Sequence, residues 1–213
     1  MVGRYNDECK NELNTICSAH VLTLDVEEET PKRFSYCGCD VKDGKLRILF
    51  QPDCLGTNID NACEEGQLFP ALNAAPATTP LSFSARLGIR NDYDAKVEEC
   101  RKQFADVTGN ADFKLNGNFD DTFAKLSAAN KSDVHQDWQS RLGGFTLSYF
   151  EGLIYQMRYI KVADDEMVQE GFNEAVEKAE AAFRIVDSLK YGSYCECVIE
   201  DGVLYLQVSE TSC

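Results

Sequence analysis

A twelve-residue segment occurs near each end of the chain, and this repeat constrains the fold more than any other feature. Ser35–Leu46 reads SYCGCDVKDGKL and Ser193–Leu204 reads SYCECVIEDGVL, so seven of the twelve positions are identical. A further cysteine follows each copy, at Cys54 and at Cys213. The repeat predicts that one structural unit is present twice in the chain.

Each copy of the repeat is predicted to form a β-hairpin. Asp-Gly between alternating apolar residues is typical of a two-residue type I′ turn, which needs a positive φ at both central positions. With turns at Asp43-Gly44 and Asp201-Gly202, residues two apart share one face of each hairpin. The residues expected to face inward are Cys37, Cys39, Val41, Leu46, Ile48 and Phe50 in the first copy and Cys195, Cys197, Ile199, Leu204, Leu206 and Val208 in the second. The opposite face of the first hairpin carries Asp40, Lys42, Lys45 and Arg47.

A helix and a strand are expected before each hairpin. In the N-terminal module the helix covers about Asp7–Cys17 and the strand covers Val21–Val26. In the C-terminal module apolar residues recur at helical spacing from Val168 to Phe183, and a strand begins within 183–186. The order of helix, strand and hairpin is therefore the same at both ends.

The predicted fold class is α+β, with antiparallel β-hairpins packed on several α-helices and cross-linked by disulfides. We expect a single compact domain, 1–213. In it, the related α-β-hairpin modules 1–54 and 165–213 meet within one antiparallel sheet and flank a different middle segment, 55–164.

The middle segment carries weaker signals. Gln51–Pro80 contains four of the five prolines and is expected to be mainly loop. Leu81–Arg90 alternates well enough for a strand, and Asp94–Phe104 has the apolar face of a helix. Asp120–Leu142 is expected to be a second helix, interrupted near Asn130.

Phe145–Tyr159 fits two structures. Glu151-Gly152 followed by apolar residues resembles the turn of the second hairpin, and β-branched and aromatic residues flank the glycine. The alternative is a buried, aromatic-rich helix, because periodicity does not separate the two for a short apolar run. We favour a third hairpin.

Ten cysteines are dispersed along the chain, and their even number suits a disulfide framework in an oxidising compartment. Zinc sites normally use Cys-x₂₋₄-Cys spacing rather than Cys-x-Cys, and only His20 and His135 are present to assist, so we predict no metal site. Neighbouring strand cysteines bond poorly to each other, so each is expected to reach a different partner. The predicted disulfide cysteines, whose pairing the sequence leaves open, are Cys9, Cys17, Cys37, Cys39, Cys54, Cys63, Cys100, Cys195, Cys197 and Cys213.

The formal net charge of −15 disfavours nucleic acid as a partner, because a phosphate backbone needs a basic surface. No stretch approaches the 18 to 20 or so apolar residues of a membrane span. Met1–Arg4 is not followed by the apolar region of a signal peptide. Because the cysteines indicate an oxidising compartment, we expect the sequence to be the mature form of a secreted protein. Asn130-Lys131-Ser132 is a sequon, and Asn130 is a candidate glycosylation site in such a protein.

No motif indicates an enzyme or a cofactor. The sequence has neither a nucleophile elbow nor a phosphate-binding glycine loop. His135 lies two residues from Asp133 and from Asp137, and residues two apart on a helix do not face each other. Cys17 near His20 is more simply explained as half of a disulfide than as a nucleophile.

Aromatic residues concentrate in the C-terminal third and are expected to form the main core. The alternative is an apolar ligand pocket between a sheet and the C-terminal helix. Its candidate lining residues are Tyr149, Tyr155, Tyr159, Phe172 and Phe183.

These features favour a secreted, disulfide-stabilised, non-enzymatic interaction protein of the effector, toxin or virulence-factor type. Its expected partner is a host or other partner macromolecule, either a protein or a glycan, and its oligomeric state stays open. The first alternative is a carrier of a small apolar ligand, and the second is an enzyme that uses a pair of carboxylates.

Overall fold

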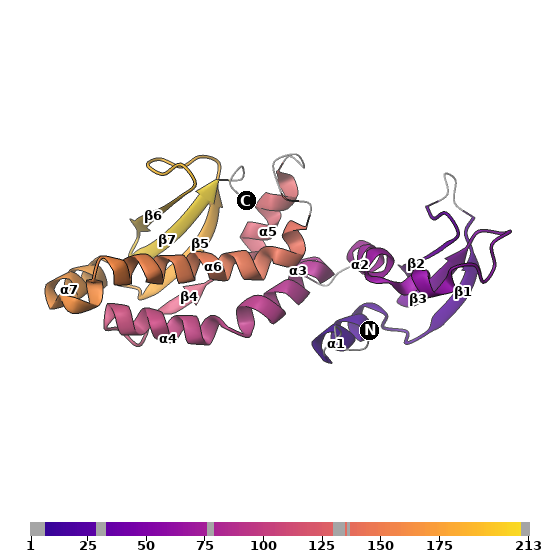
Figure 1. The fold of residues 1–213 in the computed structure, drawn as a ribbon, viewed down its shortest axis with the longest axis horizontal. Coiled ribbons are helices and arrows are strands. Elements are labelled where there is room, and N and C mark those ends of the chain that lie inside the picture. Colours follow the sequence, from indigo (N-terminus) through magenta and orange to yellow (C-terminus); the bar gives the residue numbers. More distant parts are fainter. Residues whose placement is uncertain (1–6, 29–32, 76–78, 130–134, 136, 210–213) are drawn as a thin grey trace. The chain divides into compact units, whose positions relative to one another are not determined.

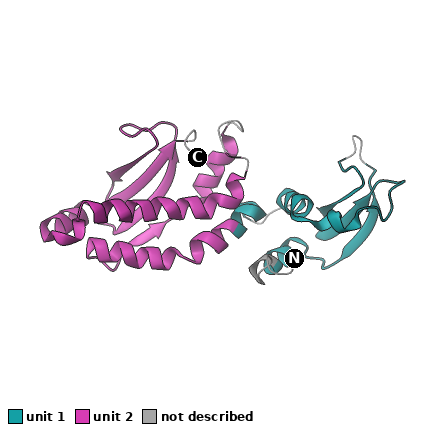
Figure 2. Ribbon diagram, viewed as in Figure 1, with its two compact units in different colours: residues 1–87 teal, residues 88–213 magenta. Residues whose placement is uncertain are grey.

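The computed structural model describes residues 7–28, 33–75, 79–129, 135 and 137–209, with side chains described from Lys10 onward. The chain divides into two compact units, 1–87 and 88–213 (Figure 2). Residues 55–87 of the expected middle segment cluster with the N-terminal module, and residues 88–164 cluster with the C-terminal module. The expectation of a single compact domain stays a prediction, and each unit is described by itself.

The first unit contains a three-stranded sheet and short helices (Figure 1). Its elements are α1 (Asp7–Ile16), β1 (Leu22–Val26), β2 (Cys37–Lys42), β3 (Lys45–Phe50), the 3₁₀ helix η1 (Ile59–Cys63), α2 (Glu65–Ala74) and α3 (Phe83–Gly88), which ends at the first residue of the second unit. The strand order is β1-β3-β2, with β1 parallel and β2 antiparallel to β3. Gln51–Pro80 is thus less irregular than expected, because it contains η1 and α2.

The second unit contains a four-stranded sheet and longer helices. Its elements are the π-helix η2 (Ile89–Asp94), α4 (Val97–Thr108), β4 (Lys114–Asn116), α5 (Phe119–Ala128), α6 (Trp138–Tyr159), the 3₁₀ helix η3 (Val162–Asp164), α7 (Glu166–Ala175), β5 (Glu180–Val186), β6 (Cys195–Glu200) and β7 (Val203–Ser209). The strand order is β4-β5-β7-β6, with β5 parallel and β6 antiparallel to β7.

The sequence repeat is a structural repeat. β1, β2 and β3 correspond to β5, β6 and β7 in order and direction, and α1 and α7 precede them. Both hairpins have the predicted register, with Cys39 opposite Ile48 and Cys197 opposite Leu206. Both Asp-Gly turns have positive φ angles at both residues, as a type I′ turn requires. The fold is thus a mixed α and β architecture, but each sheet contains a parallel pair, and the two modules form separate sheets rather than one.

The predicted third hairpin at Phe145–Tyr159 is wrong, because these residues belong to the helix α6. The residues that α6 buries recur every three or four positions, which is the spacing of one helix face. They include Leu142, Thr146, Phe150, Ile154 and Met157. Gly152 lies in open space and makes no turn.

The predicted strand at Leu81–Arg90 is also wrong. The segment forms α3 and the start of η2. Phe83, Ser84 and Ala85 are all buried, whereas a strand with one covered face would bury only alternate residues. The helix expected at Asp94–Phe104 is present as α4, and the one expected at Asp120–Leu142 is present as α5 and the start of α6. Asn130 lies outside the described residues.

The loops before the two hairpins are held by different groups at equivalent positions. In the first copy the Phe34 ring packs on Gly38, where a β-carbon would overlap the ring. In the second copy Gly192 replaces the phenylalanine and Glu196 replaces the glycine. The Glu196 carboxylate accepts backbone N–H groups of Lys190, Tyr191 and Gly192 at 2.6–3.0 Å. One copy therefore fixes this loop by ring packing and the other by hydrogen bonds.

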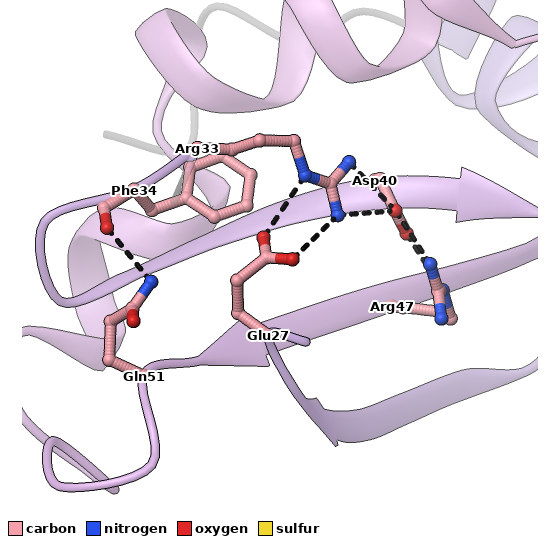
Figure 3. Close-up of polar contacts among 6 residues, drawn as sticks. All are labelled: Glu27, Arg33, Phe34, Asp40, Arg47 and Gln51. Atoms are coloured by element: carbon pink, nitrogen blue, oxygen red, sulfur yellow. Dashed lines mark hydrogen bonds and ion pairs between the residues drawn. The ribbon is translucent and has the colours of Figure 1, made fainter. Parts of the chain in front are cut away.

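Ion pairs cover the outer face of the first sheet, opposite the cysteines (Figure 3). Arg33 donates to Glu27 at 3.0 Å and to Asp40 at 3.2 Å, and Arg47 donates to Asp40 at 2.7 Å. Hydrogen bonds to Arg47 lower the pKa of Asp40 against the effect of burial. Gln51 donates to the Phe34 carbonyl at 3.0 Å, which also holds the loop before the first hairpin.

Gly38→Ala is expected to destabilise the protein by about 1–3 kcal/mol, because the added methyl group overlaps the Phe34 ring. With Phe34→Ala already present, the same substitution should cost much less, which gives a coupling free energy on the order of 1 kcal/mol. Urea denaturation of the four proteins, followed by circular dichroism, measures this coupling. Additive effects would contradict the proposed packing.

The Glu196→Gln substitution should remove a pH-dependent part of the stability. Hydrogen bonds from the backbone N–H groups of Lys190, Tyr191 and Gly192 lower the pKa of Glu196 from 4.5 to about 2, and the bond from Lys190 has the largest effect. The carboxylate therefore stabilises the folded state fully above pH 4.5, and this contribution is lost as the pH falls toward 2. Denaturation between pH 6 and 2, read by the fluorescence of Trp138, should show the wild type and the variant converging at low pH; a constant difference would exclude this role.

Candidate functional site

The open face of β1 is an exposed apolar surface on the first unit. Leu22, Leu24 and Val26 are 60%, 62% and 49% exposed, and they share the sheet face that carries Cys37 and Cys39. We call these three residues the β1 stripe. Isolated apolar residues on a surface are normal, but a contiguous row of them is typical of an interaction site.

The repeat shows that this face can be covered. Leu22, Leu24 and Val26 pair with β3 as Ala181, Phe183 and Ile185 pair with β7. These three residues of β5 are 0%, 0% and 2% exposed. The equivalent face is thus buried in one copy of the module and open in the other.

The cover in the second unit is the helix α6. The Phe145 ring lies 5.7 Å from the Phe183 ring, and the Tyr149 ring lies 5.2 Å from it. Phe145 and Tyr149 are four residues apart, so they project from one face of the helix onto the strand. Phe183 corresponds to Leu24 of the β1 stripe.

The cover in the first unit lies on the same face of its sheet, but over the β2 edge rather than over β1. η1 and α2 contact β2, and Ala62 of η1 packs with Cys37, Ile48 and Phe50. In the second unit the residues of β6 at these positions are exposed, including Cys195, Cys197 and Ile199. The prediction that the cysteines of the second copy face into the core is therefore wrong, because no described element covers β6.

Cys39 and Cys63 form a second feature of interest in the first unit. Their thiols share a hydrogen bond, which lowers the pKa of Cys63 to about 7 and raises that of Cys39. Cys37 instead donates to the carbonyl of Asn58 at 2.9 Å. The eight cysteines from Cys17 to Cys197 are free thiols in the structure, and Cys9 and Cys213 lie outside the described side chains.

The residues considered for catalysis lie apart. His135 is exposed, and its Nδ1 accepts the backbone N–H of Asp137 at 3.2 Å, which is a local turn. His20 is exposed at a positive φ, whereas Cys17 packs with Leu72 and Phe83. Within the described residues, no group of three or more histidines, cysteines or carboxylates is arranged to hold a metal ion.

Of the five residues considered as a pocket lining, the structure brings Tyr149 and Phe183 together and places the other three elsewhere. Tyr149 contacts Phe183, and Phe172 stacks on Phe113 at 5.8 Å. Tyr155 and Tyr159 are exposed on α6. Two cavities of the second unit, of about 330 and 410 Å³, are lined mainly by residues of η2, α5, β4 and β5 and by none of these five.

Sequence reasoning missed the β1 stripe and the Cys39–Cys63 contact. The strand predicted at Val21–Val26 is present as β1, but a predicted strand carries no information about what covers its faces. The two cysteines were counted as disulfide candidates, but no spacing rule joins them.

Among the described helices, none combines the length and the apolar composition that crossing a membrane requires. Comparisons with protein-family models, with curated proteins and with solved structures each gave no match.

Removing the Leu24 side chain should barely affect folding, whereas removing its counterpart should unfold much of the second unit. Leu24→Ala is expected to change the free energy of unfolding by less than about 0.5 kcal/mol. Phe183→Ala should cost about 3–5 kcal/mol, because it empties a buried aromatic site. Circular dichroism during urea denaturation measures both, and Trp138 fluorescence follows the second unit in Phe183→Ala. A core-like cost at Leu24 would show that the stripe is covered.

Proposed function

We propose that this chain is a secreted, disulfide-stabilised, non-enzymatic interaction protein of the effector or toxin type, and that it binds a partner protein through the β1 stripe. The observation that carries the proposal is the contrast between the open β1 face and its buried counterpart on β5. The module has the same strand order and register in both units, but a helix covers its first strand in the second unit, and that strand is exposed in the first unit.

The internal repeat also suggests what the partner presents. In the second unit the cover is a helix with two aromatic side chains four residues apart. A helix of this kind in a partner would place two rings over Leu24 and bury the stripe, which is the helix-in-groove mode of recognition. We therefore propose an amphipathic helix as the ligand rather than an extended strand.

Charge supports a basic partner. Glu28, just after β1, is an exposed acid, and the whole chain has a net charge of −15. A helix with lysine or arginine beside its aromatic residues would be attracted to this surface, and the association rate would fall with added salt.

The cysteine content supports the disulfide and secretion parts of the proposal. Even-numbered, dispersed cysteines are typical of proteins from oxidising compartments. Cys39 and Cys63, which are in hydrogen-bond contact, are one pair placed for oxidation.

A display library of helical peptides tests the proposed binding without knowledge of the natural partner. Peptides selected on the immobilised wild-type chain should carry two aromatic residues four positions apart and a basic flank. Leu24→Glu should weaken their binding at least about ten-fold, because a charge is placed where a ring must pack. Surface plasmon resonance gives both dissociation constants.

Ile199→Glu is the matched control. Ile199 is 46% exposed on β6 of the second unit, so the substitution adds the same charge to another exposed apolar position. It should leave peptide binding unchanged. Peptides that bind Leu24→Glu as tightly as the wild type, while circular dichroism shows both proteins folded, would exclude the β1 stripe as the site.

A further inference from the structure

Cys39 and Cys63 come from different elements and meet in the first unit. Cys39 lies in β2 and is 3% exposed, whereas Cys63 is the last residue of η1 and is half-buried. η1 packs on β2, and this contact brings the two sulfur atoms into hydrogen-bond distance.

The two thiols are not equivalent. The hydrogen bond raises the pKa of Cys39 and lowers that of Cys63. Cys63 is also the sulfur of the pair that is more accessible from solvent. A thiolate, not a thiol, attacks a disulfide, so accessibility and charge coincide at Cys63.

Neighbouring cysteines of the same unit differ in their surroundings. The thiol of Cys37 is buried and donates to the Asn58 carbonyl, and burial raises its pKa. Cys17 is buried against Leu72 and Phe83, and burial raises its pKa as well. Neither combines a neighbouring thiol in hydrogen-bond contact with the partial exposure of Cys63.

We propose that Cys39 and Cys63 are a thiol–disulfide exchange pair, in which Cys63 attacks an external low-molecular-weight disulfide and Cys39 then completes an internal bond. This inference rests on the disulfide-bonded part of the proposed function, and it does not depend on the β1 stripe.

The exchange proceeds in two balanced steps. The Cys63 thiolate attacks one sulfur of the external disulfide; a mixed disulfide forms at Cys63, and the other external sulfur leaves as a thiolate that takes up a proton. Cys39 then loses its proton to solvent and attacks the Cys63 sulfur. The Cys39–Cys63 bond forms, and the second external thiolate leaves and is protonated. Two protein thiols are oxidised, and one external disulfide is reduced to two thiols.

The repeat supplies a control position. Cys197 occupies the place of Cys39 in the second hairpin, opposite Leu206 as Cys39 is opposite Ile48. It is exposed, and the described residues of the second unit contain no counterpart of η1 over β6. Cys197→Ser should therefore leave the exchange at Cys39 and Cys63 unchanged.

The test uses the full chain, both as purified and after mild reduction under native conditions, with oxidised glutathione as the probe. Peptide mapping by mass spectrometry after alkylation should identify Cys39–Cys63 as a bond in the purified chain and as the first bond to form after reduction. Cys39→Ser should trap one glutathione on Cys63. In the Cys63→Ser variant, glutathione should modify Cys39 at least ten-fold more slowly than it modifies Cys63 in Cys39→Ser, because the Cys39 thiol is buried and has lost its neighbour.

Three results would overturn the inference. The first is a bond from Cys39 or Cys63 to a different cysteine in the purified chain, and the second is glutathione reaching Cys39 as fast as Cys63. In both cases the disulfide-bonded part of the proposed function would still stand. The third is ten unbonded thiols that stay unbonded with glutathione, which would remove that part as well and leave only the binding site to test.

Discussion

The Asp-Gly turn of each hairpin is the constraint on which the rest of the structure depends. Because both turn residues have positive φ angles, the two strands leave the turn in one register, and that register decides the face of every side chain. Cys39 opposite Ile48 and Cys197 opposite Leu206 follow from it directly. A slip of one residue would turn the apolar residues and the cysteines of a hairpin to its charged face, so the turn also decides which thiols can ever meet η1.

A defined apolar face still has to be covered, and here the two modules differ. η1 and α2 cover the β2 side of the first sheet, whereas α6 covers the β5 side of the second. Each choice leaves the opposite edge of its sheet open, at the β1 stripe in one case and at β6 in the other. The same three-stranded module can therefore differ in its available surfaces without any change in strand order, because the covering segments lie outside the repeated sequence. This difference between covers, rather than any single residue, is the source of the proposed binding site.

The sequence predicted what is local and missed what is tertiary. The hairpins, α1 before β1 and α7 before β5 could be predicted, because turn chemistry and periodicity act within a few residues. Phe145–Tyr159 is a short aromatic run with a glycine, which satisfies the periodicity of both a hairpin and a helix, and only the packing of its buried face makes it a helix. The exposure of Leu24 and the meeting of Cys39 with Cys63 depend on where η1 and α6 pack, and no local pattern contains that information.

The negative charge of the chain affects which partners can bind the open β1 stripe. An uncovered apolar edge strand favours self-association, because unpaired backbone groups and apolar side chains are exposed together. A net charge of −15 on every copy opposes that association through like-charge repulsion. The same charge attracts a basic helix. It therefore favours a basic helix over a second copy of the chain as the partner that buries Leu22, Leu24 and Val26. Raising the salt concentration should then weaken the binding of basic helices and relieve the repulsion between copies, which makes discrimination by this surface dependent on ionic strength.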